Sequence, residues 1–267
     1  MRGSGVRAGV RIVAREDGRG GTSLPVLEGG GALAVRRTRA RGTEARVMLV
    51  GAMSGPLGGD RFSVEAEVAE GARLDVRSAA ATIALPGQAK GRATYDVRLR
   101  VADRGELRWL PEPLICAGGS DVAVSTRVEM GGEGRLLLRE EQVLGRVGEE
   151  PGRLAGRLTV RVAGRTVLDQ ELVCGPGAPG AWDGPAVLAG HRAVGQLVVV
   201  RPEFRREQPA ARVLGECAAL TPLAGPAVLV TAVAADGLRL RRVLDEALSL
   251  LEQPSAQRDL IVRLSDW

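Results

Sequence analysis

The chain has 267 residues, 45% of them apolar and 26% charged, which is enough to enclose a substantial hydrophobic core. The net charge of +5 comes from arginines that alternate with acidic residues, and only 2% of residues are aromatic. Without dense basic runs or aromatic residues for stacking, the composition disfavours nucleic-acid binding.

Three widely spaced cysteines, Cys116, Cys174 and Cys217, form no Cys-x-x-Cys pair. This disfavours a disulfide framework and a thiolate zinc site. The first residues lack the apolar stretch of a signal peptide, and the apolar run at 195–200 is too short to span a bilayer. We therefore expect a cytoplasmic protein with no membrane partner.

Four regions follow one another along the chain. Residues 1–40 are rich in glycine, and we expect them to be loosely ordered at the start. Residues 41–175 are expected to form the main β domain. Residues 176–190 form a Gly/Pro-rich loop, and residues 191–267 form a C-terminal α/β portion packed on the β domain.

The main domain shows repeated apolar–polar alternation, which is typical of half-buried strands. The alternating segments are residues 61–69, 72–79, 94–102, 121–130, 134–144 and 157–173. Short turns separate them, so we expect a mainly β fold of many strands, with sheets stacked or wound on each other in a sandwich, barrel or β-helix-like arrangement. Antiparallel neighbours are the expected default, because no link is long enough for a helical crossover.

In the C-terminal portion the sequence predicts strands at 195–201 and 227–234 and one clear helix from about Leu238 to Leu251. Apolar residues recur on one face of this helix, which predicts packing against a core. They are Leu240, Val243, Leu244, Ala247, Leu248 and Leu251.

Few residues are suited to catalysis. His191 is the single histidine, so it alone would have to serve a Ser-His-Asp triad, and no multi-histidine metal centre is available. The turn "GPLGGD" at residues 55–60 lacks the Lys-Ser/Thr end of a phosphate loop, and a strand pattern follows it instead of a helix. We therefore expect neither a hydrolase of a familiar type nor nucleotide binding.

Carboxylates remain as candidate ligands. Glu140 and Glu141 are adjacent in a strand and must point to opposite faces of its sheet. If Leu136 and Leu138 mark the buried face, Glu140 points inward. It is then either paired, for example with Arg146, or exposed to an internal channel where it contacts a hard or borderline cation.

Four motifs in order resemble the urease accessory protein UreD (UreH) family: "GPLGGDRF" at 55–62, "LRWLPEPLI" at 107–115, "LLLREEQVLGR" at 136–146 and "GQLVVV" at 195–200. Segments 78–87 and 147–156 depart from the family pattern. The positions that match family motifs are Gly58, Gly59, Asp60, Trp109, Leu110, Pro111, Gly145, Arg146 and Glu149.

The resemblance implies a mainly β fold whose strands are wound in a β-helix-like, two-layer manner, with a little helix near the end. It also implies a urease maturation scaffold that is not itself an enzyme and has no tightly bound cofactor. It implies binding to the urease structural subunits and, through UreF, to the GTPase UreG, with nickel in transit through the protein. Asp60 and Glu140 are the expected transient metal-contacting carboxylates on that route. An alternative is a β-rich hydrolase or isomerase that uses Asp60, Glu140 and His191, which requires the three side chains to meet in one pocket.

Overall fold

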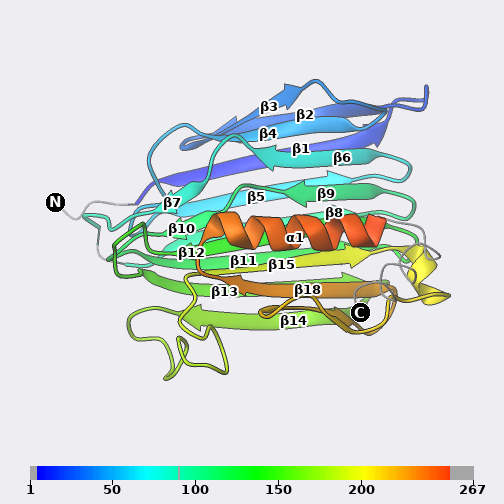
Figure 1. Ribbon diagram of the computed structural model, residues 1–267. Helices are drawn as coiled ribbons and strands as arrows, with labels where there is room; N and C mark the ends of the chain where they lie inside the picture. The colour runs from blue at the N-terminus through cyan, green and yellow to red at the C-terminus, as the bar shows by residue number, and fades with distance from the viewer. Residues whose placement is uncertain (1–4, 90, 253–267) are drawn as a thin grey trace.

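The computed structural model describes residues 5–89 and 91–252, which form two stacked β-sheets with a helix outside them (Figure 1). One sheet has seven strands in the order β14-β13-β11-β8-β5-β1-β2. Their bounds are β1 Arg7–Glu16, β2 Thr22–Gly30, β5 Arg61–Val68, β8 Ala93–Val101, β11 Asp121–Met130, β13 Arg153–Val162 and β14 Arg165–Cys174.

The other sheet has eleven strands, nine of them in the order β16-β17-β18-β15-β12-β9-β6-β4-β3, with β10 and β7 joined to it through β12. Their bounds are β3 Leu33–Thr38, β4 Ala45–Gly51, β6 Arg73–Ser78, β7 Thr82–Ala84, β9 Glu106–Leu110, β10 Leu114–Cys116, β12 Arg135–Leu144, β15 Ala193–Val200, β16 Arg212–Val213, β17 Ala218–Pro222 and β18 Ala227–Ala234. A short 3-10 helix, Pro202–Arg205, follows β15.

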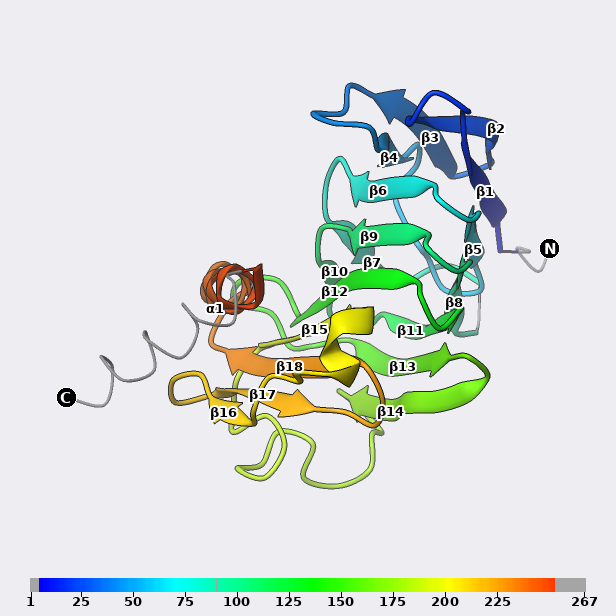
Figure 2. The ribbon, with the colours of Figure 1, turned by 90° about the vertical axis from the view of Figure 1, so that its right-hand side faces the viewer.

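Most neighbouring strands in the middle of each sheet are parallel, so the expected antiparallel default is wrong. Strands β1, β5, β8, β11 and β13 are parallel neighbours in one sheet, and β4, β6, β9 and β12 in the other. From β4 to β13 the chain passes back and forth between the two sheets, as the end-on view shows (Figure 2). A strand of the opposite sheet therefore serves as the crossover that a helix usually provides.

The core lies between the two sheets and follows the period of two along each strand. In β5, for example, Phe62, Val64, Ala66 and Val68 are buried and the residues between them are more exposed. The predicted two-layer, β-helix-like arrangement is confirmed, and each predicted alternating segment overlaps at least one strand.

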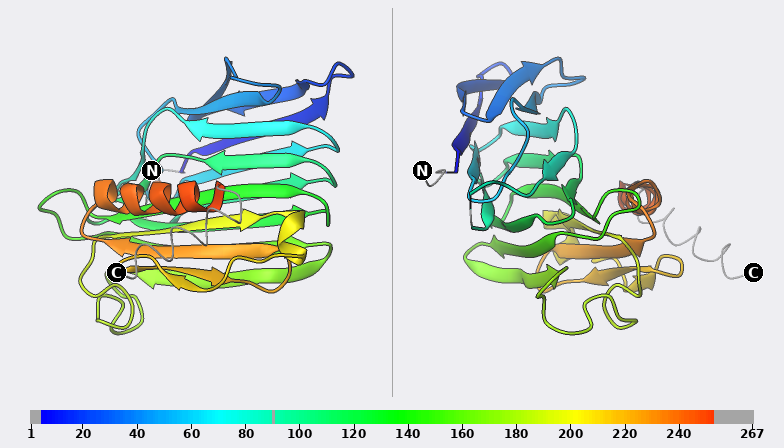
Figure 3. Two further views of the ribbon diagram at one scale, coloured as in Figure 1. Left: turned by 45° about the vertical axis from the view of Figure 1, so that its right-hand side comes forward. Right: turned by 90° about the vertical axis from the view of Figure 1, so that its left-hand side faces the viewer.

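Helix α1, Gly237–Glu252, covers the outer face of the eleven-stranded sheet (Figure 3). Leu240, Leu244, Ala247 and Leu251 are buried in it, which confirms the predicted apolar face. All eight residues of β15 are buried, because α1 covers one face and the core covers the other. A Cβ on Gly195 would lie 2.9 Å from Leu244 Cδ1, so this glycine permits the close approach of the helix.

The glycine-rich N-terminal region contributes strands β1, β2 and β3. β1 pairs with β5, so strands on both sides of residue 40 share one sheet. Residues 175–192 contain turns without a strand or helix. Residues 1–4 of the first predicted region and 253–267 of the last lie outside the described residues. Within the described chain, no helix has both the length and the apolar character needed to cross a membrane.

Candidate functional site

The eleven-stranded sheet is interrupted beside the middle of β12. β12 pairs with β9 up to Leu138 and with β10 from Gln142 onward, so residues 139–141 have no ladder partner on that side. The facing segment contains Pro111 and Pro113, which have no backbone N–H to donate to a ladder. The next strand is interrupted at the same level, because β6 ends at Ser78 and β7 begins at Thr82.

A cavity of about 310 Å³ lies at this interruption and is lined from both sheets. Phe62 and Tyr95 line its inner side, and their rings meet edge to face with centroids 6.2 Å apart. Glu112 and Glu141 line its outer side. A second cavity of about 210 Å³ extends toward β13, β14 and β15. Glu140 and Gln142 line both cavities, so Glu140 stands on the boundary between them.

The Glu140 carboxylate points into the space between the sheets, as predicted. It accepts a hydrogen bond from Thr126 Oγ1 at 2.5 Å and one from Gln196 Nε2 at 2.9 Å. Gln170 Nε2 in turn donates to Gln196 Oε1. These contacts connect the two sheets with uncharged donors. Burial raises the pKa of Glu140, and the hydrogen bonds from Thr126 and Gln196 act in the opposite direction.

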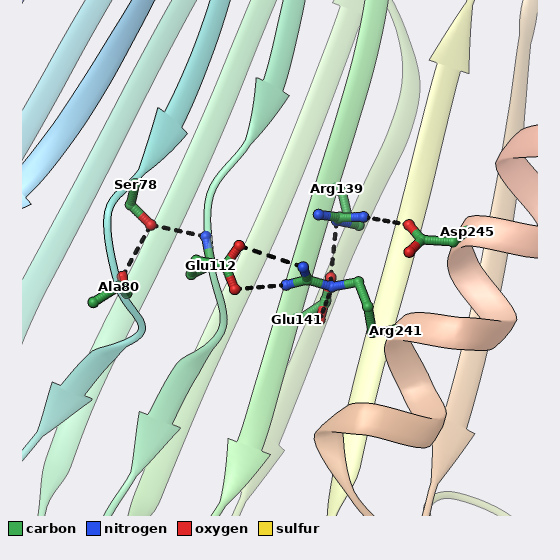
Figure 4. A network of polar contacts seen from close by, with 7 residues as sticks. All are labelled: Ser78, Ala80, Glu112, Arg139, Glu141, Arg241 and Asp245. Atoms are coloured by element: carbon green, nitrogen blue, oxygen red, sulfur yellow. Dashed lines mark hydrogen bonds and ion pairs between the residues drawn. The ribbon is translucent and has the colours of Figure 1, made fainter. Parts of the chain in front are cut away.

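The Glu141 carboxylate lies on the opposite face of the sheet, under α1, and is buried. Arg241 Nε of α1 donates to Glu141 Oε1 at 2.7 Å, and Arg139 Nε lies 2.8 Å from the same oxygen. The Arg241 guanidinium also reaches Glu112 Oε2 at 3.1 Å (Figure 4). Arg139 binds Asp245 of α1 at 2.7 Å. The helix is therefore held over the sheet interruption by ion pairs.

Asp60 has a different environment. It is buried, and both carboxylate oxygens accept backbone hydrogen bonds, from Val6 N at 2.7 Å and from Leu57 N at 2.8 Å. Asp60 precedes Val64 by four residues, and Val64 lies in the same cross-strand row as Thr126. Asp60 is thus about 13 Å along the strand direction from the level of Thr126, the residue that hydrogen-bonds Glu140. The structure does not bring the two predicted carboxylates together.

Comparison with known proteins identifies the family. The model of the UreD urease accessory protein family matches residues 6–264. The chain belongs to the UreD urease accessory protein family. It is 75% identical to urease accessory protein UreD of Streptomyces avermitilis over 94% of this chain and 100% of that relative. It is 73% identical to urease accessory protein UreD of Streptomyces coelicolor, over 93% of this chain and 98% of that relative. It is 41% identical to urease accessory protein UreD of Parafrankia sp., over 92% of this chain and 89% of that relative.

The Trp-Leu-Pro motif by which the sequence resembles the UreD family forms one side of the sheet interruption. Trp109 points into the core between the sheets, whereas Leu110 packs in the outer apolar cluster with α1. Pro111 follows directly, where pairing with β12 has stopped. In this UreD family member the motif therefore ends a strand and borders the cavity.

The Leu-Gly-Arg motif forms a turn stabilised by Arg146 and Glu149. Arg146 Nε and backbone N both donate to Glu149 Oε2, at 2.8 and 3.0 Å. The Arg146 hydrogen bonds lower the pKa of Glu149 to about 2. The suggested pairing of Arg146 with Glu140 is wrong, because Arg146 lies past the end of β12 and its side chain binds Glu149. Gly145 has a φ of 83° at this turn, which favours glycine.

His191 does not reach either predicted carboxylate. It precedes Gln196, the cross-strand neighbour of Glu140, by five residues, which places it about 17 Å away along the strand direction at about 3.3 Å per residue. Its side chain contacts Cys217. Glu112, Arg139 and Arg241 were not predicted, because the helix that carries Arg241 meets the sheet only in the folded chain. Residues Pro111 and Pro113 were the available signal for the interruption.

Proposed function

We propose that this protein acts in urease maturation as a non-catalytic scaffold that provides nickel with a path through its interior. The proposal includes binding to the urease structural subunits and, through UreF, to the GTPase UreG. Membership of the UreD urease accessory protein family supports the role in maturation. The observation that supports an interior path is the position of Glu140 between two cavities that lie between the sheets.

The surroundings of Glu140 suit passage better than storage. Its partners Thr126 and Gln196 are uncharged, so they leave the negative charge of the carboxylate available to a cation. Nickel accepts oxygen ligands, although nitrogen and sulfur ligands bind it more firmly. Among the described residues, no group of three or more His, Cys, Asp or Glu is arranged to hold a metal ion. A single carboxylate on the route would attract the ion without retaining it.

The ion pairs under α1 give the path a closed outer side. Glu112 and Glu141 line the cavity at the sheet interruption, and Arg241 donates hydrogen bonds to both. In the proposal, α1 and Arg241 keep solvent and other ions away from this opening. Both oxygens of Asp60 already accept a backbone hydrogen bond. The proposed transit role of Asp60 therefore has less support from the structure than that of Glu140.

The alternative of a hydrolase or isomerase is not favoured by the geometry. A catalytic group must lie within hydrogen-bond reach, or one water, of the group with which it exchanges a proton. Along the strands, Asp60 and His191 each lie more than about 10 Å from the level of Glu140, at about 3.3 Å per residue. No single substrate position lies within reach of all three.

The test is co-expression of variants with urease and its other accessory proteins, followed by measurement of urease activity and of nickel in purified urease. Glu140→Gln should lower both, while pull-down of the UreF-like partner stays at the wild-type level. Glu246→Gln, an exposed substitution on α1, is the matched control. Wild-type urease activity and nickel content with Glu140→Gln would overturn the interior path. Failure of the wild-type chain to pull down the UreF-like partner would overturn the scaffold role.

A further inference from the structure

Two metal-ligating side chains meet on the surface, away from the two cavities between the sheets. Cys217 Sγ lies 3.4 Å from His191 Nε2. His191 is the single histidine of the chain, and Cys217 is exposed, whereas Cys116 and Cys174 are buried. The pair therefore combines the one imidazole with the one accessible thiol.

The backbone around both residues is fixed by neighbouring strands. His191 N donates to Leu188 O at 2.8 Å, and Leu144 N donates to the carbonyl of the next residue, Arg192, at 2.8 Å. Cys217 O accepts from Val233 N at 2.9 Å. Strand β18 lies between β15 and β17. The start of β15, the end of β18 and the start of β17 lie at the same end of these strands. Both side chains are thus presented from ordered positions.

We propose that His191 and Cys217 form a two-ligand surface site for a borderline or soft divalent cation such as Ni²⁺ or Zn²⁺. A metal ion takes a thiolate sulfur at about 2.3 Å and an imidazole nitrogen at about 2.0 to 2.1 Å, so two such ligands at a tetrahedral angle are about 3.5 Å apart. The separation of 3.4 Å matches this value without movement of either side chain. Binding releases the thiol proton to solvent, and water fills the open positions.

The chemistry of the His191–Cys217 pair favours certain metal ions, and it favours metal binding over nucleophilic catalysis. Thiolate and imidazole ligands favour zinc, nickel, cobalt and copper over magnesium and calcium. A Cys–His pair for nucleophilic catalysis has a third group that orients the imidazole. Within the part of the chain that the structure describes, Cys217 is the only side chain bonded to His191. The pair therefore has the composition of a metal site and lacks the third member of a catalytic set.

The experiment titrates the purified full-length protein, under reducing conditions, with Co²⁺ as a spectroscopic probe and with Ni²⁺ in equilibrium dialysis. The wild type should show a thiolate-to-cobalt charge-transfer band. Cys217→Ser should lose the band, and His191→Gln should bind at least about tenfold more weakly, since even loss of a group that only orients a ligand costs about 10- to 100-fold. Arg192→Gln, an exposed neighbour of His191, is the matched control and should titrate like the wild type.

A second measurement follows the thiol itself. Zn²⁺ should protect Cys217 from an alkylating reagent in the wild type, and the protection should weaken in His191→Gln. Cys116 and Cys174 are buried and remain in every variant, so their contribution to the total alkylation is constant. A band that persists in Cys217→Ser, or equal binding and protection in His191→Gln, would overturn the site. The assignment does not depend on the interior path, whose test is urease activation.

Discussion

Glu140 and Glu141 are consecutive residues whose carboxylates lie on opposite faces of one sheet, Glu140 beside two cavities and Glu141 buried under α1. Glu140 faces Thr126 across the space between the sheets, and Glu141 faces Arg241 under α1. One carboxylate therefore has uncharged hydrogen-bond donors as partners, and the other has arginines. The interruption between β9 and β10 lies beside both of them.

Glu140→Gln should change how stability depends on pH. Burial raises the folded-state pKa of Glu140 above its ordinary value of 4.5, so its contribution to stability is fully present below about pH 4.5 and is lost as pH rises through the folded pKa. Over that window each pH unit lowers the free energy of unfolding by about 1.4 kcal/mol. The test is urea denaturation of wild type and Glu140→Gln over about four pH units, from about pH 4 to about pH 8. The free energy of unfolding should depend less on pH in the variant. Parallel profiles would contradict the assignment.

Arg241→Ala should destabilise the protein by about 2 to 3 kcal/mol, since it leaves the buried Glu141 with only one arginine; complete loss of a buried partner costs about 3 to 5 kcal/mol. Arg139 remains 2.8 Å from Glu141 and moderates the loss. Arg239→Ala on the same helix removes an exposed pair with Asp236 and should cost less than about 1 kcal/mol. Chemical denaturation measures both, and equal losses would show that the network under α1 contributes nothing specific.

Asp60→Ala should destabilise the protein by about 2 to 4 kcal/mol, because the backbone N–H groups of Val6 and Leu57 lose their acceptors. Asp60→Asn retains one acceptor oxygen and should lose about half as much. Asp183→Ala, on an exposed loop, should stay within about 0.5 kcal/mol of wild type. Thermal unfolding compares the three. If Asp60→Ala is as stable as wild type yet impairs urease activation, Asp60 acts on the ion and not on the fold.

The carboxyl of Glu149 should titrate at about pH 2, because Arg146 hydrogen-bonds its charged form. Its stabilising contribution is present above the ordinary value of 4.5 and is lost as pH falls through about 2. Carbon-detected NMR of the side-chain carboxyl measures the pKa directly. Arg146→Ala should move it up toward 4.5, and Arg157→Ala, whose arginine pairs with Asp169, should leave it unchanged. An unshifted Glu149 in Arg146→Ala would refute the proposed cause.

The sequence predicted each strand's inward and outward faces well, because side chains alternate along a strand whatever its neighbours are. Leu136, Leu138 and Glu140 share the inner face for this reason, and Glu141 takes the outer one. The pattern did not reveal which strands are neighbours. The short turns excluded a helical crossover but did not indicate that a strand of the other sheet serves as one.

The candidate site shows the same division. Local sequence determined the strands, the apolar face of α1, the inward direction of Glu140 and the prolines that end a ladder. Tertiary structure alone decided that α1 buries Glu141 beside two arginines, that Asp60 lies at a different level from Glu140, and that His191 meets Cys217. The physical reason is that periodicity and backbone chemistry act over a few residues, whereas the His191–Cys217 and Glu141–Arg241 contacts join residues 26 and 100 positions apart, whose meeting depends on the packing of the whole chain.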